Sequence, residues 1–553
     1  MKRIPLGIDN YEAICQNCYY IDKTNIITNL VSLPEGTSLL FTRPRRFGKS
    51  LMLSMLQAFF EQSDIDKTPL FLDKKIYENK GIIDNYFQNF PLIHLNLKDA
   101  IGSSYDDLIH KLREIISAEY ERHVSLLKSE KLSEKEKTYF SSILNETASD
   151  LDFSSSLSKL AAFLYKDSGK KIIILIDEYD APAHYAYQNG FYDRAILFLK
   201  QLFSSALKSN DSIRLAVLTG VLQIAKESLF SGLNNLVTNS ILSTNMDEGF
   251  GFLEEETKDL LKYYGYVDKI DKLRDWYGNY RFGNVMVYNP LSVLSYIQNG
   301  GEFASYWNNT GDNSILGNII EKINSSDYLL PLLNHQSISA PIDIALSYLD
   351  LDSNPANVLS FLLASGYLTI QNRLGDFLYS LSFPNKEIEN VFQREVALRY
   401  IPHSDYPLLI DIKSAFENGN ITKLKDFLEK YLLSSFSYYE IGKEKNYQIM
   451  LSVALSLIFK DYIIKNEVNA GTGRADILAY SPKGNMPAFI IETKALGSNT
   501  SQTRLKESAL NAIKQIKEKE YIDELRPYSP SVTTLYGMAF YRKRAHIESE
   551  QIH

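Results

Sequence analysis

At 553 residues the chain is too long for one ordinary hydrophobic core, which predicts two or three domains. Its hydrophobic content of 45% and charged content of 23% are ordinary for a globular protein, and no apolar run is long enough to predict a transmembrane helix. The net charge of −8 argues against a protein that coats nucleic acid over its whole surface.

Charge is distributed unevenly along the chain. Residues 431–553 hold 16 Lys and Arg against 13 Asp and Glu, so the preceding residues carry −11. A mildly basic C-terminal region fits contact with phosphates, although solvated surface charge gives the same count. The N-terminus lacks the apolar segment of a signal peptide, and the lone C-x-x-C of Cys15 and Cys18 predicts ordinary thiols. We therefore expect a cytoplasmic protein without a membrane partner.

The first predicted domain, residues 1–249, contains a strand, a loop and a helix in the order of a phosphate-binding site. The apolar run from Thr37 predicts the strand, and helical spacing after Ser50 predicts the helix. The loop between them, FTRPRRFGKS (residues 41–50), ends in the Gly-Lys-Ser of a P-loop, with Arg43 in place of the usual first glycine. The candidate nucleotide-binding residues here are Arg45, Arg46, Phe47, Gly48, Lys49 and Ser50.

These loop residues suit a nucleotide with its magnesium ion. Lys49 would reach the β- and γ-phosphates, and Ser50 would coordinate Mg²⁺. Arg45 and Arg46 would add cationic contacts to the nucleotide or to DNA.

Two further buried strands complete the predicted nucleotide site. Residues 172–176 are aliphatic and lead into Asp177, expected to hold Mg²⁺, and Glu178, expected to polarise the attacking water. Asp180 has either a structural role or a role in supporting Glu178. The strand that begins at residue 214 ends at Thr219, which is either a γ-phosphate sensor or part of an ordinary turn.

Residues 250–335 are predicted to form a helical lid. Trp276, Tyr277 and Tyr280 are its expected packing anchors. Arg281 either reaches a γ-phosphate or serves an ordinary surface role.

Residues 336–404 suggest a winged helix. A helix at 356–364 precedes two alternating strands, 367–371 and 377–383. Such a unit either binds DNA or acts as a rigid spacer, and its acidic surroundings favour the spacer. Residues 405–440 are predicted to form a helical connector.

The last predicted domain, residues 441–553, contains a second set of acidic residues. Asp476 is expected to start one strand, and Glu492 and Lys494 lie on the next, where period-two alternation places both side chains on one face. The two carboxylates can bind Mg²⁺ or Mn²⁺, and the lysine can orient a water or stabilise a developing negative charge. Glu467 is a further acid that would assist. The pattern predicts a metal-dependent nuclease core.

These motifs resemble a prokaryotic family in which an AAA-ATPase-like domain precedes a PD-(D/E)XK nuclease-like domain. The resemblance implies a P-loop parallel sheet with a helical lid, and a C-terminal restriction-endonuclease-like α/β domain. It also implies that Glu444 takes the first acidic position of the nuclease motif, that the Thr493 carbonyl completes metal coordination, and that Gln515 supports the catalytic strand. The motifs that carry the resemblance are YIDKT (20–24), RPRRFGKS (43–50), IDEYDAP (176–182), SLFSGLNN (228–235), WYGNYRF (276–282), YNP (288–290), PNKE (384–387), GRAD (473–476) and IETK (491–494).

The favoured function is therefore an ATP-binding and ATP-hydrolysing, Mg²⁺-dependent nuclease that cuts DNA under nucleotide control, in defence or mobile-element biology. The alternative is a nucleotide-dependent switch that binds nucleic acid or protein through an inactive nuclease fold. ATP and DNA are the expected partners, and a homo-oligomer is left open.

Overall fold

The computed structural model describes most of the chain. The described residues are 1–208, 210–224, 229–230, 233, 235–307, 316, 319–320, 322–323, 325–352, 354–400, 406–432, 444–470, 473–497 and 500–552. Part of one quoted motif, residues 228, 231–232 and 234 of SLFSGLNN, lies outside them. The chain forms two compact units, Met1–Thr310 with Ala340–Ile388 and Gly311–Ser339 with Glu389–His553. This grouping differs from the five predicted segments, whose boundaries stay a prediction.

The first unit is built on a five-stranded parallel sheet in the order β2-β3-β4-β1-β5. β1, β3 and β4 are buried along their whole length, which agrees with their continuous apolar runs. In register, Phe41 of β1 lies beside Thr219 of β4, and Asn96 of β2 beside Asp177 of β3. The strands are β1 (Thr37–Thr42), β2 (Leu92–Asn96), β3 (Ile172–Asp177), β4 (Ile213–Gly220) and β5 (Leu236–Asn239).

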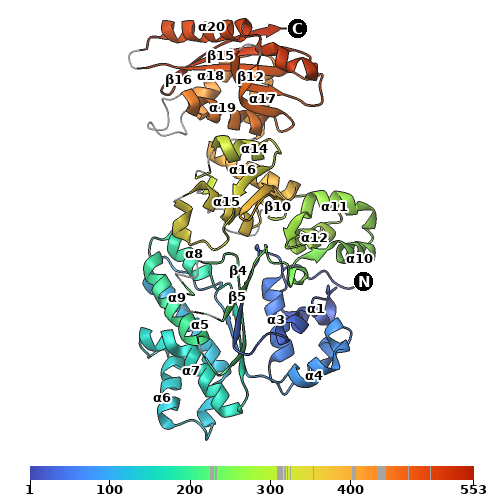
Figure 1. Cartoon of the computed structure of the whole chain (residues 1–553), viewed down its shortest axis with the longest axis vertical. Coiled ribbons are helices and arrows are strands. Elements are labelled where there is room, and N and C mark those ends of the chain that lie inside the picture. The colour runs from blue at the N-terminus through green and yellow to red at the C-terminus, as the bar shows by residue number, and fades with distance from the viewer. Residues whose placement is uncertain are drawn as a thin grey trace. The chain divides into compact units, whose positions relative to one another are not determined.

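Helices cover both faces of this sheet, with α3 on one side and α5, α7 and α9 on the other (Figure 1). Because parallel strands share one carboxyl edge, the residues that follow β1, β3 and β4 meet there. The helices are α1 (Tyr11–Asn17), α2 (Ile26–Val31), α3 (Lys49–Phe60), α4 (Lys80–Tyr86), α5 (Tyr105–Arg122), α6 (Glu134–Leu144), α7 (Asp150–Ser168), α8 (Ala181–Gln188) and α9 (Tyr192–Leu207).

The segment predicted as a helical lid also contains a small antiparallel sheet, β6-β8-β7. The helices α10, α11 and α12 agree with the predicted lid, and the strands are added because Gly283 and Asn284 form a two-residue turn, with φ +52° at Gly283, between β7 and β8. Tyr277 and Tyr280 are buried, as expected for packing anchors. The elements are β6 (Phe252–Leu253), α10 (Glu254–Tyr264), α11 (Ile270–Tyr277), β7 (Tyr280–Phe282), β8 (Val285–Tyr288) and α12 (Pro290–Gln298).

A helix and a hairpin follow at the positions that the sequence predicts. They are α15 (Pro355–Ala364), β10 (Thr369–Arg373) and β11 (Leu378–Ser382), and β11 lies between β10 and β9 (Ile338–Pro341). Residues 340–388 belong to the same compact unit as the parallel sheet.

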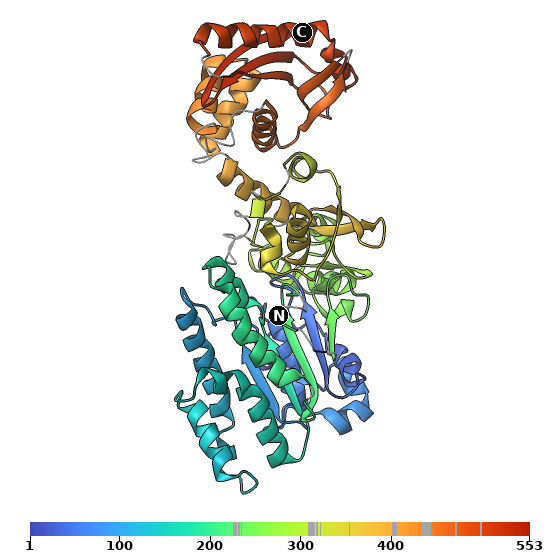
Figure 2. The same cartoon turned by 60° about the vertical axis from the view of Figure 1, so that its left-hand side comes forward.

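The second unit is built on a mixed five-stranded sheet, β12-β13-β14-β15-β16, in which only the β14–β15 pair is parallel. α20 covers one face and α17 to α19 lie on the other (Figure 2). The elements are α14 (Leu330–Leu333), α17 (Tyr406–Glu417), α18 (Ile421–Phe427), α19 (Glu444–Ile458), β12 (Ile463–Ala470), β13 (Gly473–Tyr480), β14 (Ala488–Ala495), α20 (Gln502–Glu518), β15 (Thr533–Tyr541) and β16 (Arg544–Ile552), and α16 (Lys386–Tyr400) precedes α17.

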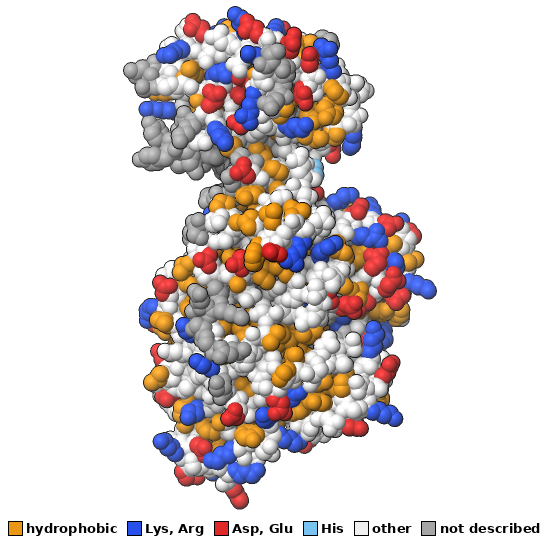
Figure 3. Space-filling view, in the orientation of Figure 1, with side chains coloured by type: hydrophobic (Ala, Val, Ile, Leu, Met, Phe, Trp, Pro, Cys, Tyr) orange, Lys and Arg blue, Asp and Glu red, His pale blue; other side chains and the backbone are white. Residues whose placement is uncertain are grey.

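Acidic and basic side chains are interspersed over the face shown in Figure 3, in keeping with the modest net charge. Within the described ranges, no helix combines the length and the apolar character needed to cross a membrane.

Candidate functional site

The phosphate-binding loop has the backbone conformation that its sequence suggests. Gly48 precedes α3 with φ +88°, and Arg46 also has a positive φ, +70°. Lys49 and Ser50 form the first turn of α3, where no side chain caps the free N–H groups. These N–H groups can therefore bind an anion.

Lys49 points into the sheet edge and is only 3% exposed. Its Nζ lies 3.3 Å from the Arg43 and Pro44 carbonyl oxygens and 3.5 Å from Glu178 Oε1. These contacts are long for charge-assisted bonds, so the ammonium retains capacity for a stronger acceptor such as a phosphate.

Asp177 lies at the end of β3, close to two neighbouring strands. Its Oδ1 accepts hydrogen bonds from the Thr219 hydroxyl and, at 3.0 Å, from the Glu178 N–H, while Asn96 Nδ2 lies 3.5 Å from Oδ2. Asp177 and Thr219, which the sequence offered as separate candidates, are therefore joined by a hydrogen bond. Asn96 was missed, although its position at the end of a buried strand is a usable signal.

The two acids after Asp177 differ in their surroundings. Glu178 has a left-handed backbone, φ +49°, and stays partly exposed beside Lys49. Asp180 is buried and accepts hydrogen bonds from the backbone N–H groups of Val221 and Leu222, at 3.0 and 2.8 Å. Burial, and then the charge of Glu178, raise the pKa of Asp180 to about 6. Asp180 therefore fixes the segment after β4, a role compatible with the structural option.

The loop residues that depart most from the usual P-loop sequence are built into the core. Arg43 is fully buried, donates hydrogen bonds to the Asn239 carbonyl and side chain, and lies over the rings of Phe250 and Phe282. Burial lowers the pKa of Arg43 to about 9. The Phe47 ring packs against Phe282, with centroids 5.0 Å apart, so only its backbone is left to contact a nucleotide.

Contacts are also defined for Lys23 and Arg281, two further basic residues of the first unit. Lys23 donates to the Glu256 carboxylate at 2.7 Å and to the Glu248 carbonyl at 2.9 Å. Arg281 lies on β7, and its backbone N–H donates to the Thr369 hydroxyl at 3.0 Å. Neither contact includes a residue of the phosphate-binding loop.

The second acidic cluster forms where β13 and β14 part. Their pairing register extends from Ala479↔Phe489 to Ile477↔Ile491 and includes no pair beyond it. Asp476, which lies inside β13 rather than at its start, instead reaches Thr493 with its side chain. Glu492 and Lys494 share one face, as alternation predicts, with Lys494 Nζ 2.8 Å from Glu492 Oε1.

Glu492 is 1% exposed and its two oxygens have different environments. Oε1 accepts hydrogen bonds from Lys494 and from the Gln515 side chain. Oε2 is buried and has no hydrogen-bond partner in the described structure. Burial, and then the charge of Asp476, raise the pKa of Glu492 to about 7, against the opposing effect of Lys494.

The other two candidate acids, Glu444 and Glu467, differ in their distance from the Glu492–Lys494 pair. Glu444, at the start of α19, has Oε1 3.9 Å from Lys494 Nζ and accepts a hydrogen bond from the Ala495 N–H at 3.2 Å. Glu467 instead pairs with Arg474 at 3.0 Å and is partly exposed. The structure therefore brings Glu444 and Gln515 to the Glu492–Lys494 pair and leaves Glu467 in a surface ion pair. Among the residues described, no three His, Cys, Asp or Glu side chains are grouped as a metal cluster.

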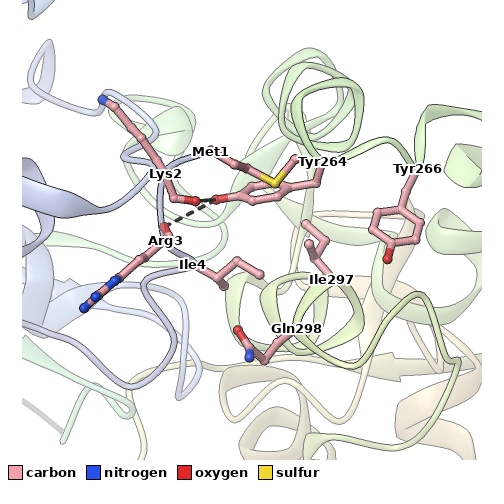
Figure 4. A pocket seen from close by; sticks show the side chains of 8 residues that line it. All are labelled: Met1, Lys2, Arg3, Ile4, Tyr264, Tyr266, Ile297 and Gln298. Atoms are coloured by element: carbon pink, nitrogen blue, oxygen red, sulfur yellow. Dashed lines mark hydrogen bonds between the residues drawn. The ribbon is translucent and has the colours of Figure 1, made fainter.

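A separate pocket of about 530 Å³ lies at the N-terminus of the first unit (Figure 4). Its lining includes Lys2, Arg3, Tyr264 and Tyr266, and the Tyr264 hydroxyl donates to the Lys2 carbonyl at 3.0 Å. No residue of the phosphate-binding loop lines it, so it is distinct from the nucleotide site.

Comparison with known proteins relates each unit to a family. Residues 5–230 match the predicted AAA-ATPase family, and residues 442–550 match the PD-(D/E)XK nuclease superfamily. An uncharacterised protein in the vnfD 5′ region of Azotobacter chroococcum mcd 1 is 27% identical over 409 residues, which cover 72% of this chain and 71% of that protein.

Among solved structures, the Aeropyrum pernix ORC2 protein in its ADPNP–ADP complexes is 9% identical and has a TM-score of 0.23. The alignment covers 70% of this chain and 93% of ORC2, but so low a score supports no statement about the fold. The family matches confirm the resemblance inferred from the motifs, and the parallel and mixed sheets fit it. The chain thus combines an AAA-ATPase-like domain with a C-terminal domain of the PD-(D/E)XK nuclease superfamily in a multidomain α/β fold.

Proposed function

We propose that this protein binds and hydrolyses ATP and cuts DNA phosphodiester bonds with Mg²⁺ or Mn²⁺ under nucleotide control. The observation that carries the nuclease part is the buried Glu492 Oε2 without a hydrogen-bond partner, beside Asp476 and Lys494. A buried carboxylate oxygen is expected to have a partner, and a divalent cation supplies one. The cation also accounts for the placement of a second acid, the partly exposed Asp476, beside the buried Glu492.

In the nuclease-like site, Asp476, Glu492 and the Thr493 carbonyl would hold the cation, which supplies activation of water and charge neutralisation at the phosphate. Lys494 is within reach of both Glu492 and Glu444, so its ammonium can orient a water or offset charge that develops on the phosphate. Gln515 fixes Glu492 through Oε1 and leaves Oε2 for the cation.

In the ATPase-like site, Lys49 would contact the β- and γ-phosphates, and the loop N–H groups from Phe47 to Ser50 would surround them. Ser50 and Asp177 would hold Mg²⁺, and the Thr219 hydroxyl fixes one oxygen of Asp177. Glu178 would orient the attacking water, for which its partial exposure is suitable. Arg45 and Arg46 would add cationic contacts.

Nucleotide control is supported by contacts of residues 340–388 with the phosphate-binding loop and with the segments that follow β3 and β4, all within the first unit. A Cβ added to Gly366 would lie 2.9 Å from the Pro44 Cβ, so the Gly366 backbone packs closely against the Pro44 ring. His184 of α8 and the Tyr348 hydroxyl are 3.1 Å apart, and Gln223, after β4, bridges to Ala345. A conformational change of the phosphate-binding loop on nucleotide binding would therefore displace residues 340–388. The chain continues from this segment into the nuclease-like unit. Defence or mobile-element biology is a setting in which such control is useful.

A nucleotide-dependent binding switch is the second candidate. It is favoured because no three acid, histidine or cysteine side chains of the described residues are grouped closely enough to hold a metal, and Glu444 contacts Lys494 rather than the two carboxylates. Such a site would hold metal weakly, and the unit would then grip nucleic acid or a protein without cutting.

One experiment separates the two. Linear, circular and single-stranded DNA are incubated with Mg²⁺ or Mn²⁺, with and without ATP, using wild type, Lys49→Ala and Glu492→Ala. Glu518→Ala, which removes an exposed acid of α20 paired with Lys514, is the matched control. The nuclease is supported if Glu492→Ala abolishes cutting and Glu518→Ala retains it. ATP should also alter the cutting rate only in proteins that keep Lys49. Absence of cutting by wild type, with DNA retained at low salt, establishes the switch.

A further inference from the structure

The Thr493 side chain is buried, although it lies between two residues that face the candidate metal site. Its hydroxyl donates to Asp476 Oδ2 at 2.8 Å, and its backbone N–H donates to the same oxygen at 2.7 Å. Thr493 is 0% exposed. One carboxylate oxygen therefore receives both donors of a single residue, which fixes the position and the plane of the carboxylate.

The sheet explains why this contact forms here. The β13–β14 pairing register ends at Ile477↔Ile491, so the next residues of β14 have no paired residue on β13. On its other side β14 stays paired with β15, where Thr493 lies beside Met538. The Thr493 N–H, which has no backbone partner on β13, therefore donates to the Asp476 carboxylate. The Thr493 hydroxyl donates a second hydrogen bond to the same oxygen.

We propose that the Thr493 hydroxyl is a positioning group that holds Asp476 beside Glu492 and thereby sets the affinity of the site for a divalent cation. This inference rests on the metal site of the proposed nuclease. A small hydrophobic side chain at position 493 would fill the same space and keep the backbone bond, but Asp476 would lose one of its two fixed donors. Groups that orient metal ligands typically change metal affinity by about 10–100-fold when removed.

The test is equilibrium binding of Mn²⁺ to the full chain without nucleotide, followed by loss of the free Mn²⁺ electron paramagnetic resonance signal. Binding that Glu492→Ala removes is assigned to this site. Thr493→Val, which removes the hydroxyl at nearly constant volume, should weaken that binding about ten-fold, the lower end of the range because the amide bond remains. Thr493→Ser, which restores the hydroxyl, should bind within about two-fold of wild type.

Thr534→Val is the matched control. Thr534 lies on the adjacent strand β15, is 0% exposed, and its hydroxyl has no hydrogen-bond partner in the described structure. It should bind Mn²⁺ as wild type does. If Thr493→Val does not fold, Thr493→Cys, a weak donor of similar size, takes its place and should also bind more weakly.

The outcomes separate this inference from the proposed function. The positioning role is overturned if a folded Thr493→Val or Thr493→Cys protein binds Mn²⁺ with wild-type affinity. It is also overturned if Thr493→Ser fails to restore binding. In either case the proposed nuclease function is retained as long as the wild type cuts DNA. Metal binding that depends on the hydroxyl, in a protein that cuts no DNA, supports the positioning role and overturns the nuclease. A wild type that binds no Mn²⁺ at this site overturns both.

Discussion

The two units each contain a deeply buried glutamate, and the contrast between them shows what marks a functional site. Burial raises the pKa of Glu387, in the first unit, and of Glu492, in the second, to about 7. Glu387 accepts a hydrogen bond at each oxygen, from the Ser292 hydroxyl at 2.7 Å and the Trp307 N–H at 2.9 Å. Glu492 has one oxygen without a partner.

A raised pKa alone therefore does not identify chemistry. Glu387 ties α12 and the chain at Trp307 to the start of α16, which is a structural task completed within the protein. Glu492 lies beside Asp476 and Lys494, and its Oε2 has no hydrogen-bond partner in the described structure, which is the pattern expected where a ligand binds. The unpartnered oxygen and the neighbouring charges distinguish the two residues.

The largest expected effect is the loss of DNA cleavage in Glu492→Gln, which tests the contrast between Glu492 and Glu387 directly. Glu492→Gln should lower DNA cleavage roughly 1,000-fold, because it removes a carboxylate that would hold the cation on which charge neutralisation at the phosphate depends. Glu387→Gln, a matched change at the other buried glutamate, should leave cleavage within about three-fold of wild type. Initial rates on one DNA substrate, with Mn²⁺ at saturation, measure both. Equal losses in the two variants would show that buried carboxylates matter here only for folding.

The next effect concerns the nucleotide site. Lys49→Ala should lower ATP hydrolysis roughly 100-fold, because the buried ammonium is the charge placed for the phosphates. Lys23→Ala removes a lysine that is likewise held between a carboxylate and a carbonyl oxygen, and should change turnover by less than about three-fold while lowering Tm. Phosphate release measures turnover. A larger loss in Lys23→Ala would place Lys23 in the nucleotide site after all.

A third prediction uses the sign of the Glu387 shift. Its pKa is raised from 4.5 to about 7 in the folded protein, so the folded state binds more protons between these values. The stability that this group contributes is therefore greatest below pH 4.5 and is lost as pH rises through 7, by an upper bound of about 3 kcal/mol. Glu387→Gln should flatten this part of the pH dependence.

The measurement is denaturant unfolding without metal at pH 5 and pH 8, followed by tryptophan fluorescence. The protein has two tryptophans, Trp276 and Trp307, and both lie in the first unit, so the signal reports on the unit that contains Glu387. Unchanged pH dependence in Glu387→Gln would contradict the assignment. Glu492→Gln serves as the control, because its site lies in the unit without tryptophan.

The smallest effect is expected at Arg46. This residue is exposed, so Arg46→Ala should weaken ATP binding by less than about three-fold, in line with the small contribution of solvent-exposed charges. Arg45 is only partly exposed, and Arg45→Ala should have the larger effect of the two. Titration with a fluorescent ATP analogue measures both. A greater loss at Arg46 would show that the loop closes around the nucleotide and buries that side chain.

The sequence by itself determined the elements of both sites, because local patterns are sufficient for them. Continuous aliphatic runs predict buried parallel strands, with Gly-Lys-Ser after the loop that follows β1 and Asp-Glu at the end of β3, and the structure places Lys49 at the start of α3 and Asp177 at the end of β3 accordingly. Alternation along β14 was enough to put Glu492 and Lys494 on one face.

Tertiary structure decided which polar groups became partners, because those contacts join residues far apart in sequence. Three such contacts have no signal in the neighbouring sequence. Arg43 is buried against Asn239 and Phe250. Asp180 accepts hydrogen bonds from N–H groups after β4, and Glu467 forms an ion pair with Arg474. The same reason applies to Glu387 and Glu492. Their chemical difference arises from Ser292 and Trp307 in one case and from the end of the β13–β14 pairing in the other, and neither is visible in the residues around them.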